Sequence, residues 1–489
     1  MTQQLYNQHL MWRAAFGPAA GQLEQLKSLS SKQLFTSLRE KSAPKPLFLD
    51  TADAYLKEMR EGADGTQMAK KLLDKGERKN FQQKHNQSIR DLNLAWLRQM
   101  VSSEGQLREK LALFWHGHFA VREKNIFFHQ DLLHIIRSNA LESFRDLLHA
   151  VSKSAAMLNF LNANQNRKGH PNENFAREVM ELFTLGRGHY TENDIKEAAR
   201  AFTGWGANFR GQFVFRSFQH DTGSKTFLGK TGNLTGEEVL DRLLEQQQTA
   251  RFITQKIYRY FVNDTPDSQK VEWLAKRFYQ SDYNISALMQ DIFTADWFYD
   301  AANRGTRIKS PVELLVGMRR MLPMAMGNED VLLLLQRVLG QLLFYPPNVA
   351  GWPGGKSWID SSSLMLRLRL PLLFGDNDEW NVRPKADDDN GGMDRMEGED
   401  MMAAVRQKGD RGMGRLGKPL QVDIDWTAHL KDFAAVPREQ LVPALAGTLL
   451  QTGSANAELI KSFADSTARD TFIKSATLRL MGLPEYQLC

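Results

Sequence analysis

The sequence contains almost no cysteine. Its 489 residues include one cysteine, Cys489, at the last position. An intramolecular disulfide is therefore excluded, and so is a metal site made of several thiolates. A nucleophilic cysteine is also not expected at the end of a chain, where residues commonly fray. Any catalytic group must come from His, Asp, Glu, Arg, Lys or hydroxyl side chains.

Long apolar runs are missing as well. No stretch approaches the roughly 18 consecutive apolar residues of a membrane span. The opening residues, MTQQLYNQHLMWRAAFGPAA, show neither the basic region nor the apolar run of a secretory signal. We therefore expect a soluble protein that stays in the cytoplasm.

Charge of one sign is not concentrated strongly enough to indicate nucleic-acid binding. The formal net charge is +6, and the most basic stretch, KKLLDKGERKNFQQKHNQSIR at 70–90, contains one aromatic residue, Phe81. Binding of single-stranded nucleic acid combines basic residues with several stacking aromatics. A solvated helix face explains this stretch better, and we do not expect nucleic acid as a partner.

Alternating strand patterns are scarce, whereas the helical period recurs along the chain. In LREKLALFWHGHF, Leu107, Leu111 and Phe114 share one stripe. Ser310 and Glu313 form the pattern of a capping box before another helix. The best strand candidate is QFVFRSF at 212–218. We predict a mainly α fold: a multi-helix globular domain with long functional loops and at most a small β-hairpin.

One segment differs in composition from the rest. Residues 384–418 are rich in Asp, Gly and Met and poor in aromatics, a composition that does not offset the entropy of ordering. We predict a helical domain over 1–383, a mobile insertion or linker over 384–418, and C-terminal helices over 419–489 that complete the same domain.

Residues 172–186, NENFAREVMELFTLG, form the most charged short helix of the sequence. At 100° per residue, the polar side of this helix gathers five side chains: Glu173, Asn174, Arg177, Glu178 and Glu181. Glu178 and Glu181 are neighbours at i,i+3, and Arg177 can pair with Glu181 at i,i+4. Two adjacent carboxylates often serve a cation, a shared proton or an arginine clamp. A solvated face with one weak salt bridge is the alternative.

Histidines provide the second group of candidates. On a continuous helix His118 lies on the apolar stripe and His116 near the opposite face, so the two cannot bind one ion unless Gly117 breaks the helix. A metal site would combine imidazoles from this segment, a carboxylate from 178–181, and His220 or Asp221 from the loop HDTGSKTFLG, which also offers Lys225. A core histidine that bonds to a carbonyl is the alternative for His118.

The longest motifs together resemble one family. HLMWRAAFGP, FWHGHFAV, PNENFAREVMELFTLGRGHYTENDIKEAARAFTGW, HDTGSKTFLG, PPNVAGWPGG and LMGLPEYQL are similar to the bacterial DUF1800 family over nearly the whole chain, apart from the Asp/Gly/Met-rich segment. Members often have Asn where Gly117 stands and Asp where Asn162 stands. The resemblance further implies a possible DUF1501-type partner, because such proteins are often encoded beside this family. Such a partner's export signal would place the protein in the periplasm.

The recurrence of the same residue types in the family favours a functional site over a solvated face. The first hypothesis is a metal- or acid/base-dependent enzyme, hydrolytic or oxidative, with zinc, iron or copper as the possible metal. Its metal ligands or proton carriers would be His116, His118, Glu181 and His220. Its catalytic residues would be Glu178 or Asp221 as the base, with Arg177 and Lys225 holding an anionic group. The second hypothesis is a non-enzymatic helical partner or maturation protein for a DUF1501-type neighbour.

Overall fold

The computed structural model describes residues 2–62, 75–375, 421–451 and 456–489. The predicted insertion at 384–418 lies outside these residues. The described chain is mainly helical, as predicted. The α-helices are α1 (Gln3–Ala14), α2 (Leu23–Ser28), α3 (Ser31–Lys41), α4 (Ala54–Gly62), α6 (Lys75–Ser102), α7 (Gln106–His118), α8 (Ile126–Asn139), α9 (Phe144–Ser152), α10 (Ala155–Phe160), α11 (Asn174–Glu178), α12 (Glu192–Ala201), α13 (Gly236–Leu244), α14 (Gln247–Phe261), α15 (Ser268–Gln280), α16 (Ile285–Phe293), α17 (Pro311–Met321), α18 (Asp330–Val338), α19 (Ser361–Gly375), α21 (Thr427–Asp432), α22 (Leu441–Leu449), α23 (Ala457–Phe463) and α24 (Arg469–Met481).

Strands are short and occur in antiparallel pairs. The described residues contain three two-stranded sheets, made of β1 (Trp205–Ala207) with β2 (Phe213–Phe215), β3 (Lys225–Phe227) with β4 (Lys230–Gly232), and β5 (Met324–Met326) with β6 (Val422–Ile424). In the first, Trp205 pairs with Phe215 and Ala207 with Phe213. The strand predicted within 212–218 is therefore confirmed, although it is shorter than that range. None of the described helices is long and apolar enough to cross a membrane.

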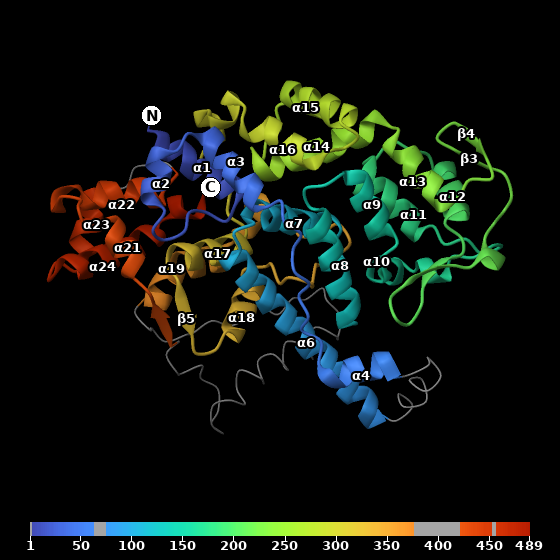
Figure 1. The fold of residues 1–489 in the computed structure, drawn as a ribbon, viewed down its shortest axis with the longest axis horizontal. Coiled ribbons are helices and arrows are strands. Elements are labelled where there is room, and N and C mark those ends of the chain that lie inside the picture. The colour runs from blue at the N-terminus through green and yellow to red at the C-terminus, as the bar shows by residue number, and fades with distance from the viewer. Residues whose placement is uncertain (1, 63–74, 376–420, 452–455) are drawn as a thin grey trace.

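The two ends of the chain lie side by side. Figure 1 shows the blue N-terminal helices next to the red C-terminal ones, and α1 contacts α22 directly. Helix α7 runs through the middle of the molecule and contacts α1, α3, α6 and α8. Helices α9 to α13 and the β3–β4 pair form the opposite end (Figure 1). The polar helix α11 belongs to this second end, as does the loop HDTGSKTFLG at 220–229, which we call the HD loop.

Local sequence signals explain where several helices begin. At α17, Ser310 Oγ accepts from the Glu313 amide and Pro311 occupies the first turn, as the capping box predicts. At α12, Thr191 and Asp194 form a second capping box, and Ile195 and Ala199 are buried. Both patterns act through the nearest turn of backbone, which is why the sequence predicted the first of them without knowledge of the packing.

Candidate functional site

The polar helix changes its geometry in the middle. Helix α11 covers Asn174–Glu178, and the chain continues without a break as a π-helix, η2, over Val179–Thr184. The amide of Leu185 donates to the Met180 carbonyl at 2.8 Å, and the Thr184 hydroxyl donates to the Val179 carbonyl at 2.7 Å. Short π segments within helices are rare and often lie at functional sites. The sequence predicted the helix but gave no signal for this widening.

Glu178 and Glu181 lie on either side of this α-to-π junction and have different surroundings. Glu181 accepts from the Tyr190 hydroxyl at 2.8 Å and from the Arg187 guanidinium. Among the described residues, no hydrogen-bond or ion-pair partner is found for Glu178, which is half-buried. The two neighbouring carboxylates therefore differ in solvation and in bonding, although they share one helix face.

These surroundings shift the two carboxyl pKa values in opposite directions. Burial, followed by the nearby charge of Glu181, raises the pKa of Glu178. Burial alone would raise the pKa of Glu181 too, but the bonds from Arg187 and Tyr190 outweigh it and lower that pKa. Burial and the bond to Glu181 also raise the pKa of Tyr190 to about 12. At neutral pH Glu181 is ionised, whereas Glu178 takes up a proton more readily than an ordinary glutamate.

The predicted i,i+4 pair between Arg177 and Glu181 does not form. Arg177 instead binds both carboxylate oxygens of Glu192, at 3.0 and 2.9 Å, and one oxygen of Glu173 at 3.2 Å. A two-pronged bond to one carboxylate suits the planar guanidinium better than a single contact. Arg177 therefore joins α11 to the start of α12, while Glu181 turns to Arg187 and Tyr190.

His118 meets the C-terminal end of the same helix. Its Nε2 lies 3.3 Å from the Phe183 carbonyl, and its Nδ1 lies 2.8 Å from Lys256 Nζ on α14. Nε2 therefore carries the proton and donates, and Nδ1 accepts from Lys256. Burial and the charge of Lys256 lower the pKa of His118 well below its ordinary value. The core-histidine alternative describes His118, except that its second nitrogen binds an amine.

Lys256 is a site residue that sequence reasoning missed. Its Nζ also lies 3.4 Å from the Leu182 carbonyl, one of those at the end of η2 that have no partner within the helix. Burial lowers the pKa of Lys256 to about 8, and no described carboxylate pairs with it. The sequence shows only a lysine on the amphipathic stretch QQTARFITQKIYRYF, and nothing in that pattern distinguishes it from a solvated one.

His116 contacts a different part of the molecule from His118. Its Nε2 accepts from the Phe344 amide at 3.3 Å, and its ring lies near the rings of Trp96 and Trp352. Burial lowers its pKa to about 3, so it is neutral. The contact joins α7 to the loop 341–360, in which Trp358 is 6% exposed. The aromatic side chains of this loop therefore pack it against the core.

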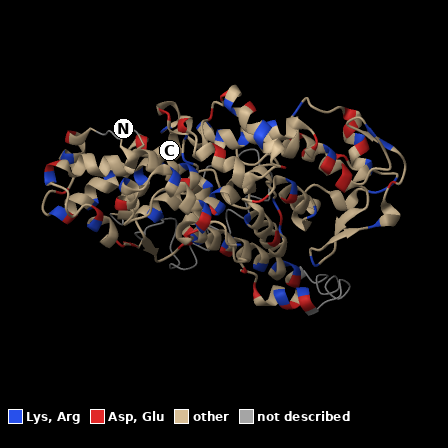
Figure 2. Ribbon diagram, turned by 45° about the horizontal axis from the view of Figure 1, so that its top comes forward, with Lys and Arg blue, Asp and Glu red and all other residues tan. Residues whose placement is uncertain are grey.

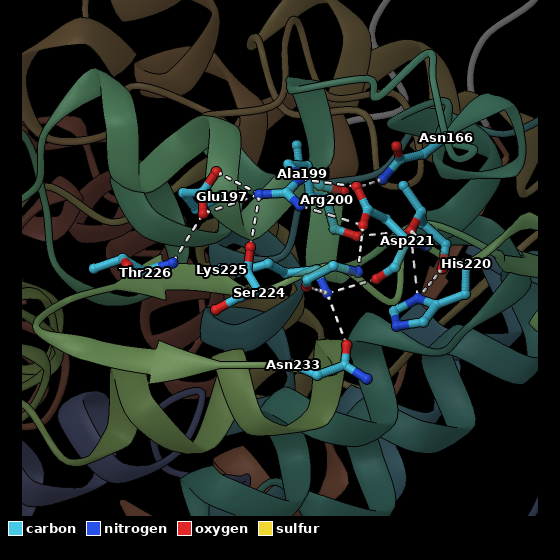
Figure 3. Close-up of polar contacts among 12 residues, drawn as sticks. Asn166, Glu197, Ala199, Arg200, His220, Asp221, Ser224, Lys225, Thr226 and Asn233 are labelled. Atoms are coloured by element: carbon cyan, nitrogen blue, oxygen red, sulfur yellow. Dashed lines mark hydrogen bonds and ion pairs between the residues drawn. The ribbon is translucent and has the colours of Figure 1, made fainter.

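The HD loop forms a compact network of its own, shown in Figure 3. Asp221 accepts from Arg200 through both oxygens, at 2.8 and 3.3 Å, and this bond lowers the pKa of Asp221 to about 2. Lys225 Nζ donates to the Asp221 and Gly223 carbonyls and to Asn233 Oδ1. All three ammonium protons are thus used within the protein, so Lys225 as placed has no donor left for a substrate anion.

His220 differs from its neighbours because half of its ring has no partner. Its Nδ1 lies 2.9 Å from the Thr203 carbonyl (Figure 3), so Nδ1 carries the proton and Nε2 is an acceptor. No described residue bonds to Nε2. A backbone bond to one nitrogen is the usual way in which a protein orients the other for a metal or a proton.

The predicted residues form separate groups around one helix. The HD loop approaches the start of α11 through Asn166, whose Oδ1 accepts from the Asn172 amide and whose carbonyl accepts from the Gly204 amide. His118 approaches the other end of the same helix, at Phe183. In the described residues, no three His, Cys, Asp or Glu side chains are grouped so that they could hold a metal ion. The segment with His116 and His118, the polar helix and the HD loop therefore do not form one pocket.

One departure from the family pattern has a backbone explanation. Asn162 adopts a left-handed conformation, with φ of 58°, at the start of a short 3-10 turn. Asn and Asp both tolerate this region because their short polar side chains bond locally. The exchange between these two residue types therefore keeps the turn.

The fold and the site define a mainly α protein with a carboxylate- and arginine-rich helix in the end of the molecule formed by α9 to α13. Acidic and basic residues are interspersed over both ends of the molecule (Figure 2). The chain belongs to the DUF1800 family: the family model described as "Protein of unknown function (DUF1800)" matches residues 9–488. No curated protein and no solved structure matches the chain.

Proposed function

We propose that the protein is an acid/base catalyst in which Glu178 exchanges a proton with the substrate and Glu181 remains ionised. The observation that carries this proposal is the contrast between the two neighbouring carboxyls. One is bonded to Arg187 and Tyr190, and the other is half-buried with no described partner. Pairs of titratable groups whose environments push their pKa values apart commonly divide the acid and base roles between them.

The reaction that suits such a pair is a hydrolysis. Glu178, with its raised pKa, would donate a proton to the leaving group, and the ionised Glu181 would orient or deprotonate a water molecule. Arg187, whose side chain is 87% exposed beside Glu181, would attract an anionic part of the substrate. Arg177 would act as a positioning residue, because its bonds to Glu173 and Glu192 hold the helix against α12.

A metal is a separate part of the proposal. Glu178 and Glu181 are the candidate ligands, with no third His, Cys, Asp or Glu side chain of the described residues grouped beside them, and zinc, iron or copper would each accept carboxylate donors. Elemental analysis of the purified protein tests this part. One equivalent of a transition metal, lost in Glu181→Gln but kept in Glu173→Gln, would support it. Folded wild-type protein without stoichiometric metal, after purification free of chelators, would end it.

The catalytic test uses two glutamates of one helix. Glu178→Gln keeps the size of the side chain and removes its proton exchange, whereas Glu173→Gln changes a carboxylate that pairs with Arg177. Across a panel of chromogenic esters, phosphate monoesters and glycosides, Glu178→Gln should lower kcat about 10²–10⁴-fold. Glu173→Gln should change it about tenfold or less. Equal activity of the two variants on a substrate that the wild type hydrolyses would overturn the proposal.

A second candidate function rests on the network around Asp221. Arg200, Lys225 and Asp221 satisfy one another and the surrounding carbonyls, which is typical of a network that orients structural elements. This favours a non-enzymatic partner or maturation protein for a DUF1501-type neighbour, exported with it or retained in the cytoplasm. Co-expression tests the idea. A stable one-to-one complex that survives Glu178→Gln would support it, and separate elution at micromolar concentration would count against it.

A further inference from the structure

A cluster of buried basic residues lies between α1, α7, α17 and the end of the chain. We call it the basic cluster, and it consists of Arg13, Lys110, Arg307, Lys309 and Arg367 around Glu313. All six are at most 5% exposed, and four of the five cations are fully buried. Lysine and arginine are almost never fully buried unless they are paired. The cluster lies outside the polar helix, so its role is independent of the acid/base proposal.

Direct contacts hold the cluster together. Lys110 Nζ lies 2.5 Å from one oxygen of Glu313, and Arg307 lies 3.5 Å from the other. Lys309 Nζ sits between two aromatic rings, 3.6 Å from the centre of Trp12 and 3.7 Å from that of Tyr486. The other two arginines donate to backbone carbonyls. Arg13 donates to the Asn303 carbonyl at 2.8 Å, and Arg367 donates to the Lys309 carbonyl at 3.0 Å.

Positive charge exceeds negative charge in this region. Glu313 and the negative charge at Cys489 act on Arg13, Lys110, Arg307 and Lys309. Asp264 contributes as well, but its side chain is exposed and its effect is weakened by solvent. Lys309, whose pKa burial lowers to about 7, relieves part of the excess. At least two buried cations still lack a buried counter-charge, and each such ion is costly without one.

Unused hydrogen-bond donors accompany the excess charge. The buried nitrogen or hydroxyl atoms without a partner include Arg13 Nε and Nη1, Arg307 Nη1, Arg367 Nε and Nη2, Trp12 Nε1 and the Tyr260 hydroxyl. The Arg307 guanidinium lies 4.6 Å from the centre of the Tyr260 ring. Nearly all of these atoms can only donate. Buried water would satisfy some of them but would bring hydrogens of its own that need acceptors, whereas an anion only accepts.

We propose that the basic cluster binds a small inorganic anion, of the size of chloride, beside Arg13, Arg307 and Tyr260. The anion supplies the missing negative charge and accepts from the unused donors of these side chains. It acts as a structural ion that joins α1, α14 and the segment around Arg307, because each contributes one of the three residues. Burial of the site makes a small, weakly hydrated halide a better fit than a large organic anion.

Crystals of the full chain, purified and grown in sodium bromide, test the proposal directly. Bromide scatters anomalously, and a peak within hydrogen-bond distance of Arg13 and Arg307 is expected. The absence of a peak at the basic cluster in well-ordered crystals would overturn the inference. This measurement uses the wild-type protein, so it does not depend on a variant that folds poorly.

Thermal unfolding provides the measurement in solution. At matched ionic strength, Tm in sodium chloride should exceed Tm in sodium gluconate, whose anion is too large to enter, by about 3 °C at a hundredfold excess over Kd. Arg13→Met should lose this difference. Arg108→Met should keep it, because Arg108 is also buried but bonds to four backbone carbonyls elsewhere. A chloride effect of the same size in Arg13→Met would contradict the assignment, and an equal effect of phosphate would mark an oxyanion as the ligand.

Discussion

Replacement of Glu313 should lower the stability of the protein strongly, because Glu313 is the one carboxylate side chain within the basic cluster. Glu313→Gln keeps the shape of the side chain. It also keeps the capping box, since glutamine can accept from the Ser310 amide as Glu313 does at 2.7 Å. The substitution therefore removes the negative charge that Lys110 and Arg307 face, and it replaces the oxygen that accepts from Lys110 with a nitrogen that cannot accept.

The expected magnitude follows from the burial of both partners. The side chains of Lys110 and Glu313 are 0% and 1% exposed, and breaking a buried pair from one side costs about 3–5 kcal/mol because a charge is left uncompensated. Unfolding entropy is about 2.1 cal/mol/K per residue, or about 1 kcal/mol/K for 489 residues that unfold together. Glu313→Gln should therefore lower Tm by about 3–5 °C.

Differential scanning calorimetry at pH 7 checks this value. The matched control is Glu458→Gln, which breaks an exposed i,i+3 pair with Lys461 and should lower Tm by well under 1 °C. Lys110→Met should cost less than Glu313→Gln, because it removes one cation from an excess of cations. A Tm for Glu313→Gln within 1 °C of the control would refute the claim that Glu313 compensates buried charge.

Three further substitutions test the polar helix and its neighbours. Because the folded pKa of Glu178 is raised, its ionised form costs stability above that pKa, so Glu178→Gln should raise Tm at pH 8 and leave it unchanged below about pH 4. The folded pKa of Asp221 is lowered to about 2. The stability that Asp221 contributes is therefore complete above about pH 4 and is lost as the pH falls toward 2. Asp221→Asn should lower Tm by about 2 °C at pH 7 and by less at pH 2.5. Lys256 has a folded pKa of about 8, so its charged form lowers the stability of the protein at pH 7. This cost disappears between about pH 8 and about pH 10. The Tm of the wild type relative to that of Lys256→Met should therefore rise over that interval. A pH-independent Tm difference in any of these pairs would contradict the corresponding assignment, and melting curves from pH 2.5 to 10 provide the measurement.

Much of the fold could be predicted from local patterns. The capping box at Ser310 acts within one turn of helix, and that helix begins where the sequence indicates. The strand Phe213–Phe215 lies within the predicted 212–218 segment. Its partner, Trp205–Ala207, was not predicted, because a strand of three residues gives no alternation that can be distinguished from the end of a helix.

The candidate site was predictable only in part. The sequence placed Glu178 and Glu181 on one helix face, but it could not show that Glu181 would bind Tyr190 and Glu178 would bind nothing among the described residues. His118 and His220, which were predicted to serve one centre, bond to different backbone carbonyls, those of Phe183 and Thr203. Lys256, which contacts His118 at 2.8 Å, is separated from it by 138 positions, and periodicity carries no information over that distance.

By itself the sequence determined the helical class, the main polar helix, the absence of disulfides and membership of the family, because each depends on residue types and short spacings. Only the tertiary structure decided which of the charged residues are buried, which have partners and where cations accumulate without counter-charge. Desolvation is the physical reason: the same lysine or glutamate costs nothing in water and is costly in the interior, and burial is set by contacts between segments far apart in the chain.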